Sequence, residues 1–376
     1  MLKGIYLTLL VGPVVPLPVP QVVLCALTSV TVTNDTAETG GGFELNFTLS
    51  NRSPLHTVFL LAAGNTPLLR VILIATINGM PEVMMDGVTT LVQVNPGSGG
   101  QSTLNVTGKD LTKLMDSNLI DFSGIPYPAM PAEARVALII AKYAMFGMLP
   151  LVIPSLFTDV PLPFERMPAH EGSDLHYVRR LAAEVGYVFY VDPGPVPGVN
   201  TAYWGPEIKV GPAQPALNLD MDAHTNVESI NFGLETGEKV LPIVFIQNAL
   251  TKISIPIPIP NVNPLQPPLG VTGLLPTKVE VMRETAKLSP MAAISRGVAR
   301  AAKSADSVTG NGTLDVVRYG RLLKARRLVG VRGAGMAFDG LYFVKSVTST
   351  IKRGEFKQSF KLTRNGLISI TPLVPV

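Results

Sequence analysis

The sequence predicts a β-rich α+β protein in which two β modules flank an α/β insertion. Three observations favour this class. The 34 glycines and 33 prolines among 376 residues lie well above the roughly 12% of an average chain, so turns are frequent and strands short. Hydrophobic residues make up 47% of the chain and charged residues 15%, which excludes a disordered chain. Helical periodicity is concentrated in the middle of the chain and in one later segment, with strand patterns around both.

The first module, residues 1–110, has strand patterns throughout. Phe43–Leu49 alternates apolar and polar residues, which indicates a half-buried strand. Leu68–Ile77 is a nearly continuous Leu/Val/Ile run, which is typical of a strand buried on both faces. Further strands are expected at Ile5–Val11, Gln21–Leu27, Thr90–Val94 and Thr103–Thr107. The single cysteine, Cys25, lies in an apolar run and is expected to be buried.

The stretch from Gly4 to Asn34 contains no charged residue and has the apolar character of a signal peptide or a membrane span. Four prolines interrupt it, at Pro13, Pro16, Pro18 and Pro20. Each proline would remove a helical hydrogen bond, so a lipid-exposed helix is excluded and stable membrane insertion is not expected. A cleaved export signal stays open as an alternative.

The insertion, residues 111–218, contains the first helices. A helical turn is expected at Asp110–Met115, and Pro131 opens a longer helix. Ser173 is a good N-cap for a helix over 174–185, which Gly186 ends. Tyr187–Val191 then follows as a strand.

The second β module, residues 219–376, contains one helix and a closing hairpin. The proline-rich segment Lys252–Pro268 fits an extended chain or an edge strand. Ser289 and Pro290 predict the start of a helix over 290–305, whose buried face comprises Met291, Ile294, Val298, Ala301 and Ala305. Strands at 341–351 and 356–364 are joined by a short connection and form the hairpin 341–364.

Catalytic and metal-binding patterns are missing from the sequence. The four histidines, His56, His170, His176 and His224, have no metal-ligand spacing and are expected to be structural or surface residues. Gly330–Gly335 has its glycines in the wrong order for a dinucleotide site. An enzyme needs a nucleophile, a base and an orienting group together, and no such set is recognisable. Neither an enzyme nor a cofactor is therefore predicted.

Basic residues are concentrated in the second half of the chain. Residues 1–218 have 11 basic and 16 acidic residues, a net charge of −5, whereas residues 219–376 have 20 and 11, a net charge of +9. Candidate residues for a partner interface or a channel lining are Arg296, Arg300 and Lys303 on one helix side, and Arg318, Arg321, Lys324, Arg326 and Arg327 in a run where a strand is favoured. A solvated basic surface is the alternative. Specific nucleic-acid binding is not expected, because Tyr319 is the only aromatic residue within this run.

Three stretches together resemble the tail-hub family of contractile phage tails, often labelled late control protein D. The first is Leu104–Leu111, which is similar to the strand and Gly-x-Asp-Leu segment with which the chain leaves the family's first barrel. The second is Ser173–Tyr190, similar to a helix–Gly–strand unit that also occurs in type VI secretion spikes. The third is Gly340–Thr348 with Lys352–Phe356, similar to the closing hairpin. The sequences of these three stretches are most similar to those of hubs from extracellular contractile injection systems.

The resemblance implies two tube-like β-barrel modules per subunit and a homotrimer with pseudo-sixfold symmetry. Such a trimer would join the hexameric inner tube to a trimeric spike and contact other baseplate proteins. The sequence ends at Val376 just after the hairpin, so a spike on a separate polypeptide is expected. Assembly in the bacterial cytoplasm as part of a phage tail-like particle is implied, with release or membrane anchoring open. The alternatives are an exported β-sandwich binding protein and, less favoured, a tail-associated cell-wall hydrolase.

Overall fold

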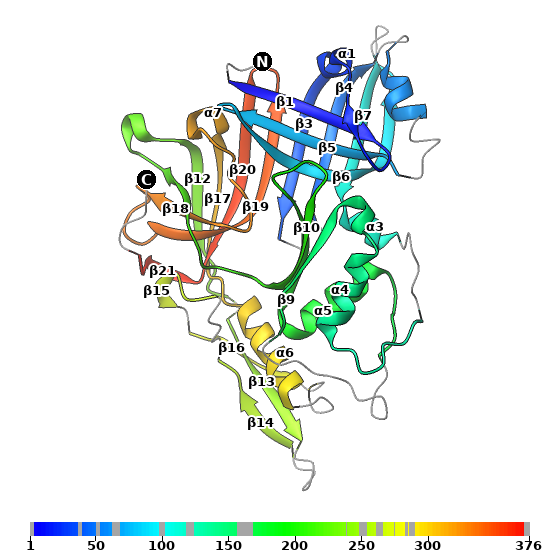
Figure 1. Cartoon of the computed structure of the whole chain (residues 1–376). Coiled ribbons are helices and arrows are strands. Elements are labelled where there is room, and N and C mark those ends of the chain that lie inside the picture. The colour runs from blue at the N-terminus through cyan, green and yellow to red at the C-terminus, as the bar shows by residue number, and fades with distance from the viewer. Residues whose placement is uncertain are drawn as a thin grey trace.

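The computed structural model describes residues 4–36, 40–49, 53–61, 68–97, 102–117, 124–155, 168–237, 239–247, 254–260, 266–273, 275–282, 285 and 290–371. The fold is mostly β, as predicted, and one large sheet dominates it (Figure 1). Within these residues no helix has the length and apolar character needed to cross a membrane.

The first module forms one half of a 13-stranded sheet. Its strands are β1 (Ile5–Gly12), β2 (Leu17–Pro18), β3 (Leu27–Asp35), β4 (Gly42–Leu49), β5 (Arg70–Ile77), β6 (Met80–Asn95) and β7 (Ser102–Asp110), ordered β3-β4-β7-β6-β5-β1-β2. The strand prediction for Phe43–Leu49 is confirmed, and alternate residues of β4, including Phe43 and Leu45, are buried. The run at Leu68–Ile77 is also confirmed, since β5 is buried on both faces. A π-helical turn, η1 (His56–Leu61), lies between β4 and β5.

One predicted strand of this module is wrong. Gln21–Leu27 forms a short helix, α1 (Gln21–Ala26), and β3 starts only at Leu27. Val23 is fully buried and Leu24 and Ala26 pack partly against the core, whereas Val22 is 63% exposed. This apolar run therefore has one core-facing side rather than two buried faces. Cys25 consequently lies at the surface, and the prediction that it is buried is also wrong.

The second β module continues the same sheet. Its strands are β12 (Val227–Leu234), β17 (Val308–Asp315), β18 (Leu328–Arg332), β19 (Gly340–Lys352) and β20 (Glu355–Arg364). The last strand of the insertion, β11 (Gln214–Asn218), joins this sheet by pairing with β18. The predicted hairpin 341–364 is confirmed as β19 and β20, which pair antiparallel. A ribbon of β15 (Gly270–Gly273) and β21 (Gly366–Ser369) lies beside it, and η3 (Asp222–His224) precedes β12.

The two modules meet where β3 pairs antiparallel with β19, from Ser29↔Lys352 to Asp35↔Ser346. Residues more than 300 positions apart therefore share one hydrogen-bonded ladder, and buried side chains from both modules form one hydrophobic core. Figure 1 shows these strands side by side across the top of the molecule. Continuous backbone pairing therefore joins the two modules into one sheet with one core.

The insertion lies below the first module and has its own core (Figure 1). Its helices are α3 (Thr112–Asp116), α4 (Ala132–Ala141) and α5 (Asp174–Val185), and a short 3-10 helix, η2 (Ala144–Phe146), follows α4. Its strands are β8 (Met148–Val152), β9 (Tyr187–Pro193) and β10 (Asn200–Pro206). They form a sheet with the order β8-β10-β9. The predicted cap of α5 is confirmed, because the Ser173 hydroxyl accepts from the backbone N–H of His176. Gly186 ends this helix with φ +72°.

A small unit projects from the second module and is called the satellite below. It comprises β13 (Val240–Gln247), β14 (Ser254–Pro258), β16 (Lys278–Met282) and α6 (Pro290–Lys303). The sheet order is β14-β13-β16, so the proline-rich β14 is an edge strand as predicted. The helix prediction for 290–305 is confirmed by α6, but Met291 is 51% exposed rather than buried. The proposed cap, Ser289, lies outside the described residues.

Candidate interaction surfaces

Two of the three predicted basic residues on α6 form ion pairs within the chain. Arg300 donates to both carboxylate oxygens of Glu280 on β16, at 2.6 to 3.1 Å. Arg296 lies 3.3 Å from the carboxylate of Glu184 on α5. Lys303 is exposed at the end of the helix. The charges of α6 thus mainly fasten the satellite sheet and α5 to this helix.

The basic run at 318–327 is not a strand, contrary to the prediction. It begins in the helical turn α7 (Val316–Tyr319) and continues as a loop up to β18. Asp315 caps the turn by accepting from the N–H of Val317, and Gly320 ends it with φ +80°. The loop has its apolar side chains in the core, including Leu322 and Leu323. Its exposed cations are Arg318, Arg321, Lys324 and Arg327.

Arg326 differs from its neighbours because its side chain is only 7% exposed. Its guanidinium lies 2.5 Å from a carboxylate oxygen of Asp192 on β9, and also donates to the backbone carbonyl of Asp35. The same group lies over the ring of Tyr190, 4.1 Å from the centroid. Arg326 therefore joins the second module to the first and to the insertion through contacts within this chain.

The two basic clusters do not form one patch. Figure 1 shows α7 at the top of the molecule and α6 at the lower end, with the large sheet between them. Lys324 lies 3.3 Å from Glu82 on β6, and both side chains are partly solvent-exposed, so this pair contributes little to stability. Of the predicted basic residues, those that are exposed are Lys303 at the end of α6 and the four cations around α7.

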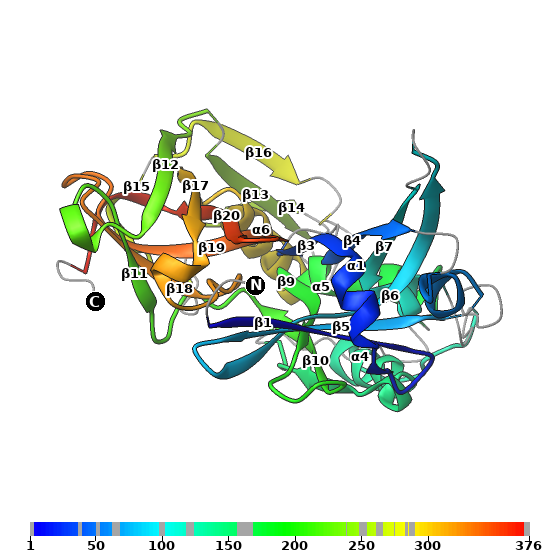
Figure 2. The ribbon, with the colours of Figure 1, turned by 90° about the horizontal axis from the view of Figure 1, so that it is seen from above.

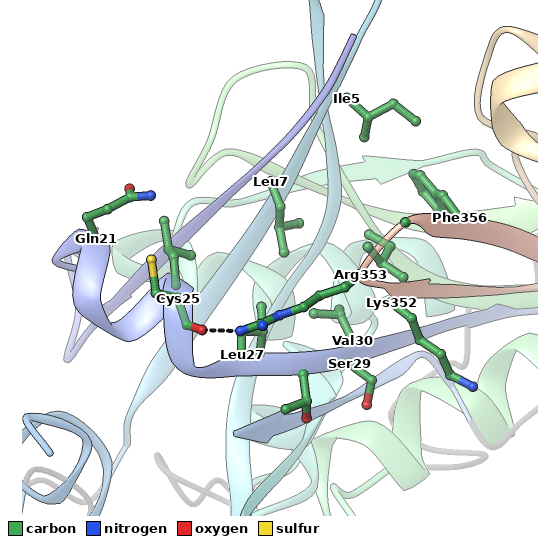
Figure 3. A pocket seen from close by; sticks show the side chains of 14 residues that line it. Ile5, Leu7, Gln21, Cys25, Leu27, Ser29, Val30, Lys352, Arg353 and Phe356 are labelled. Carbon is green, nitrogen blue, oxygen red and sulfur yellow. Dashed lines mark hydrogen bonds between the residues drawn. The ribbon is translucent and has the colours of Figure 1, made fainter. Parts of the chain in front are cut away.

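An apolar pocket of about 520 Å³ lies at the junction of the two modules. Figure 3 shows it between β1, α1, β3 and the turn of the β19–β20 hairpin. Ile5, Leu7, Val30 and Phe356 line its interior. Arg353 closes one side by donating to the backbone carbonyl of Cys25 at 2.5 Å. The pocket is the right size for a small ligand, and polar side chains, including Gln21, Ser29 and Lys352, lie around its apolar interior.

A second set of buried polar contacts joins the first module to the insertion, and the sequence did not predict it. Arg70 on β5 donates to both carboxylate oxygens of Asp86 on β6, at 2.6 and 2.7 Å. Asn200 on β10 donates to the same carboxylate at 2.8 Å, and Arg70 also reaches the carbonyl of Gly198. All three side chains are buried. Together with Arg326, this pair fixes the insertion against the large sheet.

His170 belongs to a buried polar cluster in the insertion. Its Nε2 lies 3.1 Å from the carboxylate of Asp174, and its Nδ1 lies 3.1 Å from the hydroxyl of Tyr127. Tyr143 donates to Asp174 at 2.5 Å, and Lys142 pairs with the same carboxylate. Burial raises the pKa of Tyr127 to about 12. The cluster ties α4 to the start of α5, so the structural interpretation of His170 is confirmed.

Comparison with known proteins rests on the fold. No family model and no curated protein matches the sequence. A tail protein from Neisseria meningitidis MC58 superposes with a TM-score of 0.63 at 13% identity, covering 97% of this chain and 98% of that one. The 43 kDa tail protein of prophage MuSo2 from Shewanella oneidensis gives 0.61 at 16% identity, covering 96% and 98%.

The chain has the fold of phage tail proteins. The same tail-protein fold recurs in an Escherichia coli component of the type VI secretion system that is described as structurally similar to the T4 tail proteins gp27 and gp5. That match has a TM-score of 0.55 at 12% identity and covers 93% of this chain and 76% of that one. The resemblance to tail and baseplate proteins is therefore supported at the level of the overall, mostly β fold.

Proposed function

We propose that this protein is the baseplate hub of a contractile injection system, a homotrimer that joins the inner tube to a separate spike. The observation that carries the proposal is the agreement along nearly the whole chain with two tail proteins. The role is structural, and neither a cofactor nor catalysis is part of it.

The continuous sheet supports this role mechanically. A hub must transmit load between a tube above and a spike below without hinging between its modules. Pairing of β3 with β19 and the buried Arg326 and Arg70 joints remove such hinges. The strand order of the described residues is an open path from β12 to β2. Closure of tube-like barrels, and the pseudo-sixfold ring, would therefore come from neighbouring copies in the trimer.

The proposal is tested by the mass and shape of the purified protein. Light scattering with size-exclusion chromatography should give three times the 40.1 kDa chain mass. Negative-stain images should show a ring with a central channel. A monomer at all concentrations, or a compact particle without a channel, would contradict the hub.

A further inference from the structure

The satellite sheet has two apolar faces, and in the part of the chain that the structure describes only one of them packs against a helix, α6. On the inner face, Val244 and Ile259 pack against Ala293 of α6. The approach is close, since a Cβ added at Gly297 would lie 2.7 Å from Ile259 and 2.9 Å from Val244. This face forms a small core with α6.

The outer face follows from the strand register. Because Ile243 lies opposite Val281 and Pro258, and Leu241 lies opposite Val279, these side chains point away from α6. Val279 is 58% and Val281 46% exposed. Among the described residues, the strand positions that point outward are Leu241, Ile243, Phe245, Pro256, Val279 and Val281, together with Pro258 and Ser254 at the two ends of β14. We call this surface the outer face.

An outer face of this kind is unusual for a solvated sheet. Strands with one face on a core and one in water normally alternate apolar and polar residues. Here the charged residue Glu280 of β16 is on the inner side, where it pairs with Arg300. Contiguous exposed apolar surface marks a protein interface.

Charge and position indicate which partner covers it. Residues 239–303, which contain the satellite, have eight basic and two acidic residues, a net charge of +6, whereas the insertion at 111–218 has seven and ten, a net charge of −3. The insertion also exposes apolar residues on an edge strand, because Leu149 and Leu151 of β8 are 53% and 50% exposed and Pro150 between them is exposed.

The two apolar surfaces lie at opposite ends of a layered stack. Contacts run from the satellite sheet to α6, from α6 to α5 and from α5 to β9, and β8 is at the far edge of the β8-β10-β9 sheet. Figure 2 shows β13, β14 and β16 on the opposite side of the molecule from β10 and α4. The surfaces therefore cannot meet within one chain, but they can meet between copies.

We propose that the outer face of one copy packs against the insertion of a second copy, next to β8. This contact is heterologous, so repeating it generates a closed ring if the rotation between copies permits. Opposite net charges favour and orient the encounter, and the apolar residues supply the affinity. The inference rests on the proposed trimeric hub and names the surfaces that would hold it together.

The first arm of the test is a double variant, Val279→Glu with Val281→Glu. Both side chains are exposed in the single chain, so the fold should be retained, which circular dichroism checks. Burying two carboxylates in the contact should raise the concentration for half-assembly at least about tenfold. The matched control, Val271→Glu with Met336→Glu, adds the same charge at positions 65% and 84% exposed elsewhere, and should assemble like the wild type.

The second arm maps the contact directly. A benzophenone maleimide is attached to Val281→Cys in a Cys25→Ala background, and isotopically light and heavy chains are mixed. We expect cross-links between light and heavy chains, and we expect them in peptides that contain residues 148–152. The same label at Val271→Cys should give no cross-link to these peptides. A wild-type trimer with an unaffected double variant, or with cross-links elsewhere, would overturn this inference and leave the hub intact. A wild-type chain that stays monomeric would overturn both.

Discussion

Single buried polar residues decide how the three parts of this chain are held together. Arg326 is the clearest case, since one guanidinium contacts Asp192, Tyr190 and the carbonyl of Asp35. Its backbone has φ +63°, which places it in the left-handed region and turns its side chain away from the exposed cations around it. A buried charge without its partner is costly, so these contacts are mutually dependent.

Replacing Arg326 should therefore destabilise the protein strongly. For Arg326→Ala we expect a loss of about 2 kcal/mol, because the Asp35 carbonyl loses its donor and the ring of Tyr190 loses the guanidinium packed on it. Asp192 contributes less, since its side chain is 46% exposed and is rehydrated. The neighbouring exposed residue gives the control, Arg327→Ala, with a change within about 0.5 kcal/mol. Urea unfolding followed by tryptophan fluorescence measures both. Equal stability of the two variants would mean that Arg326 is an ordinary surface cation.

The sequence could not separate Arg326 from the other cations of its run. Its partners lie 134 and 291 residues away along the chain, and only the folded chain brings them together. The sequence did predict that the run is basic and that Gly320 interrupts it, and four of its five cations are exposed in the structure.

Among the elements, α6 links the satellite to the insertion, because it packs against both the satellite sheet and α5 (Figure 1). Gly186, at the end of α5, lies so close to α6 that an added Cβ would be 2.7 Å from the Cβ of Ala299. The periodicity of both helices was sufficient to predict them. Their contact was not predictable, because 113 positions separate Gly186 from Ala299 and the side chains involved are small.

This contact predicts a difference between two glycine substitutions at helix ends. Gly186→Ala and Gly320→Ala both place alanine at a positive φ, +72° and +80°, and each should cost about 1 kcal/mol for that reason. At Gly186 the clash with Ala299 adds to this cost, whereas nothing lies within 4 Å of an added Cβ at Gly320. We expect Gly186→Ala to be the less stable by about 1–3 kcal/mol. Thermal unfolding compares them, and equal melting temperatures would argue against tight α5–α6 packing.

The loop around α7 supplies a prediction at the level of a surface. Arg318, Arg321, Lys324 and Arg327 are exposed, so changing all four to Glu should leave the fold intact. If they steer the hub onto tube or spike, this reversal should block assembly, while single alanines stay nearly silent.

Complete particles counted by electron microscopy in cells that produce the quadruple variant test this surface. The fold of the purified variant, checked by circular dichroism, is the control. Should particle numbers and cargo both stay normal, these residues would be plain solvated surface. Normal numbers with altered cargo would instead assign them to the channel wall.

The whole molecule is organised by the pairing of β3 with β19. The sequence predicted β-rich modules at both ends and helices between, and the hairpin, α5 and α6 were found where expected. It could not show that the modules share one sheet, because strand pairing between residues 315 positions apart, such as Thr33 and Thr348, leaves no local pattern. The strand predicted at Gln21–Leu27 is the helix α1 for a related reason. A short apolar run fits a buried strand or a helix equally well, and only the packing of the folded chain decides between them.

The central claim is that this single rigid sheet is one third of a hub ring. The most direct test is cryo-electron microscopy of the purified full-length chain, with the mass of the particle measured by light scattering from the same sample. The account predicts a trimer of about three times 40.1 kDa, with a threefold ring, a central channel and β3 still paired with β19 in every copy. A stable monomer, or an assembly without a channel, would contradict it.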